Sequence, residues 1–99
     1  MSTNTSINEK IKVKIKEPKR YKVVMYNDDF TSMEFVVFVL VNIFKKPNEE
    51  AINIMMTVHK SGKAIVGIYS YDIAMSRVEK TTALARQEGY PFKLKIEEA

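Results

Sequence analysis

The turn Asn27-Asp28-Asp29 places one amide and two carboxylates on consecutive residues, and these side chains could hold a cation. An α-ammonium group suits such a turn, because it carries three hydrogen-bond donors and is largely charged at neutral pH. Asn27 and either Asp28 or Asp29 would supply two acceptors, and an imidazole nitrogen or a water molecule would supply the third. The chain has one histidine, His59. These residue types therefore indicate a site for a free amino terminus.

The same residues also have a purely structural interpretation, because asparagine and aspartate are common turn formers and helix caps. Against it, Thr31 can cap the following helix by itself, and adjacent carboxylates repel each other. By this argument the turn needs neither Asp28 nor Asp29. For His59, the common role of a lone histidine is that of a half-exposed helix residue. The sequence leaves both interpretations open.

Apolar side chains near this turn could form a slot beside the amine site. They are Met33, Val36, Met55 and Val58. Methionine adapts its shape to varied apolar guests, although a methionine or valine on an amphipathic helix usually fills the core. Charge-assisted hydrogen bonds and one buried large side chain together support a dissociation constant of about 1 μM. That affinity suits transient capture and release.

Three segments have the composition or the alternation of β-strands. Residues 21–26 and 64–69 are β-branched and aromatic, and residues 92–97 alternate between apolar and charged side chains. Residues 10–17 also alternate, but Pro18 follows them directly. We expect residues 1–17 to be a flexible tail, with an added edge strand as the alternative.

Three helices are predicted between these strands, each with a capping residue at its start and a helix breaker at its end. The third helix should turn an apolar stripe toward the core. The starts and ends are Thr31 and Pro47, Asn48 and Gly62, and Ser70 and Gly89. The stripe consists of Ala74, Val78, Thr81 and Ala85.

The order strand, helix, helix, strand, helix, strand predicts an α+β fold for residues 18–99, because 99 residues suffice for one core. We expect a two-layer sandwich in which three helices cover one face of a three-stranded sheet. Two helices between the first and second strands return the chain antiparallel. An all-antiparallel sheet then requires the first strand in the middle.

Composition argues against several classes of function. Without cysteine and with one histidine, the chain lacks the ligands of an ordinary zinc site and the means for thiolate catalysis. Three glycines and no nucleophile constellation argue against nucleotide chemistry and against an enzyme. No apolar run is long enough for a membrane span, and no signal-peptide pattern begins the chain. We expect a cytoplasmic protein without metal or other cofactor.

The net charge of +4 is unevenly distributed, because residues 1–22 carry +5 and the remainder carries −1. The basic tail leaves one alternative function open, that of a ribosome-associated or nucleic-acid-associated module. The folded part has no basic face by composition, so any affinity for polyanions would reside in the tail. We expect a monomer that binds neither nucleic acid nor membrane.

Several segments together resemble the ClpS family, the adaptor of bacterial Clp proteases for the N-end rule. They are Tyr21-Lys22-Val23, the stretch from Asn27 to Val36, Val58-His59 and Gly62-Lys63-Ala64. The resemblance covers about residues 18–99 and implies the α+β fold of a ribosomal stalk C-terminal domain. It also implies a function: binding proteins that begin with Leu, Phe, Tyr or Trp and delivering them to a Clp AAA+ unfoldase for degradation.

The resemblance further implies roles for single residues. Asn27, Asp28 or Asp29, and His59 would bind the substrate's α-amine. Met33 would be a gatekeeper that excludes β-branched first residues. The side-chain pocket would be lined by Thr31, Met33, Val36, Met55, Val58 and Phe92.

On the third helix, Asp72 and Arg77 would contact the N-terminal domain of a ClpA-type or ClpC-type unfoldase. Two positions depart from the family pattern. Ser32 stands where proline is frequent, and Phe92 stands where the residue is usually aliphatic. A larger ring at position 92 would make the pocket shallower.

Overall fold

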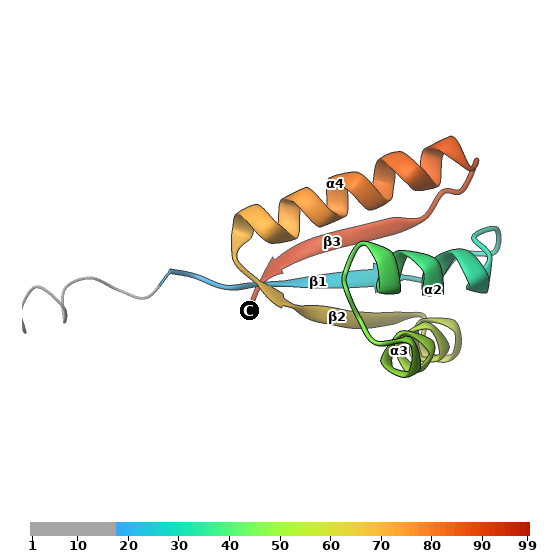
Figure 1. Cartoon of the computed structure of the whole chain (residues 1–99), viewed down its shortest axis with the longest axis horizontal. Helices are drawn as coiled ribbons and strands as arrows, with labels where there is room; N and C mark the ends of the chain where they lie inside the picture. Colours follow the sequence, from blue (N-terminus) through green and yellow to red (C-terminus); the bar gives the residue numbers. More distant parts are fainter. Residues whose placement is uncertain (1–17) are drawn as a thin grey trace, which may run out of the picture.

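The computed structural model describes residues 18–99 (Figure 1). The predicted tail, with its alternative strand over residues 10–17, lies outside the described residues. The described chain runs β1 (Tyr21–Tyr26), α2 (Met33–Asn42), α3 (Asn48–Ser61), β2 (Lys63–Tyr69), α4 (Tyr71–Gln87) and β3 (Lys93–Glu98). This is the predicted order of elements.

The three strands form one antiparallel sheet in the order β2-β1-β3. The first strand therefore lies in the middle, as predicted. Tyr26 at the end of β1 is opposite Lys63 and Lys93, the first residues of β2 and β3. The next residue, Asn27, donates its backbone N–H to the Gly62 carbonyl at 2.8 Å. The end of β1 is thus fixed to the end of α3.

The helices α2, α3 and α4 all lie over the same face of the sheet (Figure 1). Between the two layers lies the core, with Val23 and Met25 of β1 and Val39 and Leu40 of α2 fully buried. In α4 the predicted stripe is confirmed: three of its four members are buried, and Val78 packs against the core from a half-buried position. The buried members are Ala74, Thr81 and Ala85.

Two of the predicted helix caps are wrong. Ser32, not Thr31, caps α2, because its hydroxyl oxygen accepts a hydrogen bond from the Phe35 N–H at 3.1 Å. The Thr31 hydroxyl is instead a donor to Asp28. Asn48 is the first residue of α3, preceded by Pro47 at the capping position. Proline suits the start of a helix because its φ angle is already helical and it has no N–H to satisfy.

Two of the three helices end at the predicted breakers, Gly62 and Gly89. Gly62 ends α3 with a φ of 88°, a left-handed conformation that strains any residue with a Cβ. Gly89, with a φ of 79°, follows the end of α4. The prediction that α2 continues to Pro47 is wrong, because the last helical residue is Asn42 and the chain turns away through Lys45, which has a φ of 59°. Each turn begins a short connection to the next element.

Gly67 of β2 is closely covered by Tyr69. A Cβ atom on Gly67 would lie 2.5 Å from the Tyr69 hydroxyl oxygen and 2.8 Å from its Cζ. The ring cannot easily move, because the Arg77 guanidinium lies 5.0 Å from its centroid and Phe44 packs against it. In the described residues, the Tyr69 hydroxyl is also the one buried side-chain polar atom without a hydrogen-bond partner.

We predict that Gly67→Ala lowers the free energy of unfolding by about 1 to 3 kcal/mol, because the added methyl group overpacks this position. Urea denaturation of the purified protein measures the change. Tyr69→Phe removes the hydroxyl without adding volume and should change stability little. Combined with Gly67→Ala, it should recover part of the loss, and an unchanged loss in the double variant would contradict the proposed clash.

Candidate functional site

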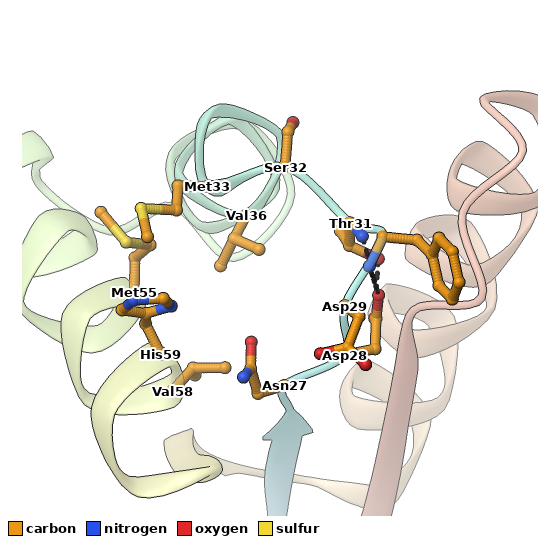
Figure 2. Close-up of a pocket in the computed structure, with 11 residues that line it drawn as sticks. Asn27, Asp28, Asp29, Thr31, Ser32, Met33, Val36, Met55, Val58 and His59 are labelled. Atoms are coloured by element: carbon orange, nitrogen blue, oxygen red, sulfur yellow. Dashed lines mark hydrogen bonds between the residues drawn. The ribbon is translucent and has the colours of Figure 1, made fainter.

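A cavity of about 420 Å³ opens where β1 ends, between the first turn of α2 and the C-terminal half of α3 (Figure 2). Its volume falls in the range of small-ligand sites. Polar residues from the β1–α2 turn and apolar residues from the two helices share its wall. The lining residues are Asn27, Asp28, Asp29, Phe30, Thr31, Ser32, Met33, Val36, Met55, Val58 and His59.

Helix periodicity brings the apolar lining residues together. Met33 and Val36 are three residues apart in the first turns of α2, and Met55, Val58 and His59 follow one face of α3 at spacings of three and four. Figure 2 shows Val36 and Val58 pointing into the cavity from opposite helices, with Met33 and Met55 together on one side. The four apolar residues singled out in the sequence therefore lie together in the wall of one cavity.

Asp28 organises the polar turn. Its Oδ1 accepts hydrogen bonds from the N–H groups of Phe30 at 2.8 Å and Thr31 at 2.7 Å. Its Oδ2 accepts the Thr31 hydroxyl at 2.7 Å. The argument that this turn needs neither aspartate is therefore wrong, because Asp28 satisfies backbone donors that precede the helix. Both of its carboxylate oxygens are already engaged.

The environment of Asp28 lowers the pKa of its carboxyl group. Partial burial acts to raise this pKa, but the hydrogen bonds from Thr31 and Phe30 favour the ionised form and outweigh it. The positive charge of Arg86 on α4 acts in the same direction as those hydrogen bonds. Asp28 is thus a charged member of the turn at neutral pH.

Asn27, Asp29 and His59 are exposed and differ from Asp28 in their contacts. Within residues 18–99, their side chains take part in no hydrogen bond or ion pair. In Figure 2 the Asn27 amide points into the cavity from the end of β1, between Asp29 and His59. The cavity therefore offers an amide oxygen, a carboxylate and an imidazole to a ligand.

Phe92 does not line this cavity. It is 1% exposed, immediately precedes β3, and packs edge-to-face on Phe35 with ring centroids 6.1 Å apart. The expectation that its ring makes the pocket shallower is therefore wrong, because the ring belongs to the core beneath α2. Every other residue predicted for the amine site or the pocket lines the cavity.

Two lining residues were not predicted as part of the site. Phe30 is 73% exposed, the most exposed of the large apolar residues in the described part of the chain. An aromatic residue in the middle of a polar turn has no strand or helix to bury it, and that signal could have identified it. Ser32 also lines the cavity, but its side chain points away from the centre and caps α2 (Figure 2).

The two residues predicted to contact an unfoldase, Asp72 and Arg77, lie on α4 and not in the lining of the cavity. Asp72 is exposed in the first turn of the helix. Arg77 is half-buried, and its Nη1 donates to the Phe44 carbonyl at 3.4 Å while its guanidinium lies over the Tyr69 ring. Arg77 therefore has a structural role in addition to any surface role.

In residues 18–99, no three side chains among His, Asp and Glu are grouped so that they could hold a metal ion. No helix of this part of the chain has the length and apolar character needed to cross a membrane. A small α+β domain whose cavity offers polar acceptors on one side and thioether and aliphatic groups on the other belongs to the class of ligand-binding proteins.

Residues 16–95 match the family described as the ATP-dependent Clp protease adaptor protein ClpS. This match spans most of the chain, so the chain belongs to the ClpS family. Its function is accordingly that of an adaptor for an ATP-dependent Clp protease.

Curated relatives carry the same family name. The ATP-dependent Clp protease adapter protein ClpS of Clostridium acetobutylicum is 47% identical over 100 residues, covering 99% of each chain. The ClpS protein of Burkholderia mallei is 47% identical over 96 residues, covering 97% of this chain and 92% of the relative. That of Oleidesulfovibrio alaskensis is 41% identical over 98 residues, covering 99% and 94%.

A solved structure confirms the fold class. Agrobacterium tumefaciens ClpS2 bound to L-phenylalaninamide matches with a TM-score of 0.80 at 36% sequence identity. The match covers 84% of this chain and 100% of that chain. The α+β arrangement predicted from the sequence is thus that of a ClpS protein.

We predict different roles for the two aspartates of the turn. Asp28→Ala should lower the free energy of unfolding by about 1 to 2 kcal/mol at pH 7, because three donors lose their protein acceptor. Asp29→Ala is the matched control and should leave stability unchanged. Denaturant titration measures both, and equal losses would contradict the assignment.

The loss caused by Asp28→Ala should also depend on pH. Because folding lowers the pKa of Asp28, its contribution is fully present above the ordinary aspartate pKa of about 3.9 and disappears as pH falls through the folded-state pKa. The wild-type and Asp28→Ala stabilities should therefore converge in acid.

Proposed function

We propose that this protein binds the free amino terminus of proteins that begin with Leu, Phe, Tyr or Trp, and delivers them to a Clp AAA+ unfoldase for degradation. The observation that carries the proposal is the division of the cavity. The side chains of Asn27, Asp29 and His59 present acceptors that have no partner within residues 18–99, and an apolar slot lies directly beside them. An amino-terminal residue has the matching halves, an ammonium group and a side chain on the same carbon.

In this proposal the α-ammonium group is held by Asn27, Asp29 and His59. Its three donors match an amide oxygen, a carboxylate oxygen and an imidazole nitrogen. Asp29 takes the carboxylate role rather than Asp28, because Asp28 already accepts three hydrogen bonds from the turn, whereas the Asp29 carboxylate accepts none within residues 18–99. Asp28 acts indirectly, by fixing the conformation that places Asp29 at the rim.

The first side chain of the substrate occupies the slot formed by Met33, Val36, Met55 and Val58. Thr31 contributes wall but no free hydroxyl donor, because its hydroxyl is bound to Asp28. Met33 is 43% exposed and acts as the gatekeeper, excluding first residues branched at Cβ. The ligand of the Agrobacterium protein, L-phenylalaninamide, has the features that this site would recognise: a free α-amine and an aromatic side chain.

Delivery requires a second surface. We place it on α4 at Asp72 and Arg77, facing the N-terminal domain of a ClpA-type or ClpC-type unfoldase. In this proposal the protein is a cytoplasmic monomer without a nucleic-acid partner. It needs no catalytic activity, because an adaptor only captures and releases its substrate. Separate surfaces allow the substrate and the unfoldase to be bound at the same time.

We predict that a peptide beginning with Phe or Leu binds with a dissociation constant of about 1 μM. Acetylation of its amine should abolish binding, since the acetylated nitrogen is neutral and has one donor. Fluorescence anisotropy measures both peptides. Equal affinity for the two forms would refute the amine site.

In the same assay, Asp29→Ala and His59→Ala should each weaken binding about tenfold or more, because each removes an acceptor for the charged amine. Glu79→Ala, an exposed carboxylate of α4 outside the cavity, is the matched control. If Glu79→Ala weakens binding as much as Asp29→Ala, general electrostatic attraction rather than a defined amine site would account for affinity.

For the unfoldase surface, we predict that Asp72→Ala weakens binding to the isolated N-terminal domain without changing the melting temperature. Arg77→Ala should lower both the affinity for the N-terminal domain and the melting temperature, since it also removes the contacts with Tyr69 and Phe44. Calorimetric titration and thermal unfolding separate the two effects. Unchanged unfoldase binding by Asp72→Ala would argue against this surface.

A further inference from the structure

Two of the five methionines in the described residues line the proposed binding cavity, namely Met33 and Met55. They come from α2 and α3 and lie on the same side of the cavity in Figure 2. Met33 is 43% exposed and is the most exposed methionine of the described chain, whereas Met25 is fully buried in the core. The thioethers therefore differ widely in their access to solvent.

An exposed thioether reacts with peroxides. The sulfur lone pair attacks one peroxide oxygen, the O–O bond breaks, and a sulfur–oxygen bond forms. The thioether is oxidised by two electrons to a sulfoxide, and hydrogen peroxide is reduced to water. Exposure governs which methionine reacts first, so Met33 should be oxidised before Met25.

From this arrangement we infer that Met33 is an oxidation site whose sulfoxide closes the pocket to apolar first residues. The inference rests on the proposed function, because it concerns the same cavity. A sulfoxide oxygen is a strong hydrogen-bond acceptor, and a bound apolar side chain would strip the water from it. Burial of a polar group without a partner is unfavourable.

The apolar part of the cavity wall offers the sulfoxide no hydrogen-bond donor, and the side-chain donors of Asn27 and His59 belong to the amine site. Val36, Met55 and Val58 have no side-chain donors. The Thr31 hydroxyl donates to Asp28, and the Ser32 side chain points away from the cavity. Oxidation of Met33 thus turns one wall of an apolar slot polar, without a neighbouring hydroxyl to satisfy it.

The change is also reversible, because methionine sulfoxide reductases return the sulfoxide to the thioether. Peroxide would therefore suppress capture of proteins with large apolar first residues, and reduction would restore it. The core would be preserved, since Met25 is out of reach of the oxidant.

The test uses the full chain treated with dilute hydrogen peroxide. Peptide mass spectrometry measures the sulfoxide at each methionine, and anisotropy with a Phe-initiated peptide measures affinity. Met33→Leu removes the reactive sulfur. Met75→Leu, which changes a half-buried methionine of α4 outside the cavity, is the matched control. Each variant is compared with its own untreated form, so the effect of the substitution itself cancels.

We expect treated wild type and treated Met75→Leu to lose affinity by about tenfold or more, equivalent to about 1.4 kcal/mol. Met33→Leu should lose less than about twofold, and methionine sulfoxide reductase should restore the wild type. Full Met33 sulfoxide with unchanged affinity, or an equal loss in Met33→Leu, would overturn the inference and leave the proposed function intact. A failure of untreated protein to bind the peptide would overturn the proposed function itself, and this inference with it.

Discussion

The Asp28 carboxylate is the interaction on which the arrangement of the site depends. By accepting two backbone N–H groups and one hydroxyl, it closes the turn between β1 and α2. The next carboxylate is then directed to the rim, and the first turn of α2 is placed so that Met33 and Val36 reach the cavity. A turn without this acceptor would leave donors unsatisfied next to a helix start, where the first N–H groups have no partner in the helix backbone and Ser32 satisfies that of Phe35.

The topology could be predicted from the sequence because helix-breaking residues clearly mark where the elements end. Pro47, Gly62 and Gly89 separate segments with different periodicity. Because two helices connect the first strand to the second, an all-antiparallel sheet requires the first strand in the middle. Boundaries were predicted less well where two neighbouring residues compete for one role. Thr31 and Ser32 can both cap a helix, and the hydrogen bond from Thr31 to Asp28 decides between them.

The candidate site could be predicted in composition but not in detail. Adjacent aspartates are chemically identical, and only the three-dimensional turn distinguishes the one bound by backbone donors from the one at the rim. The position of Phe92 could not be predicted for a different reason. Strand alternation indicates that a side chain faces inward, but not whether it lies in the core or lines a pocket. Its ring packs against Phe35, which is next to the cavity-lining Val36 in α2 but is buried in the core. Phe30 was overlooked because exposed aromatic residues in turns follow no periodic pattern.

The hydrogen bond from the Asn27 N–H to the Gly62 carbonyl joins two segments that lie far apart in the sequence. It ties the strand end that carries Asn27 to the helix end that carries His59, three residues before Gly62. The acceptors are thus preorganised across a rigid junction, and a guest does not have to order them at a cost in conformational entropy. Association with such a junction needs little induced fit, so a passing chain end can be sampled and rejected within a brief encounter.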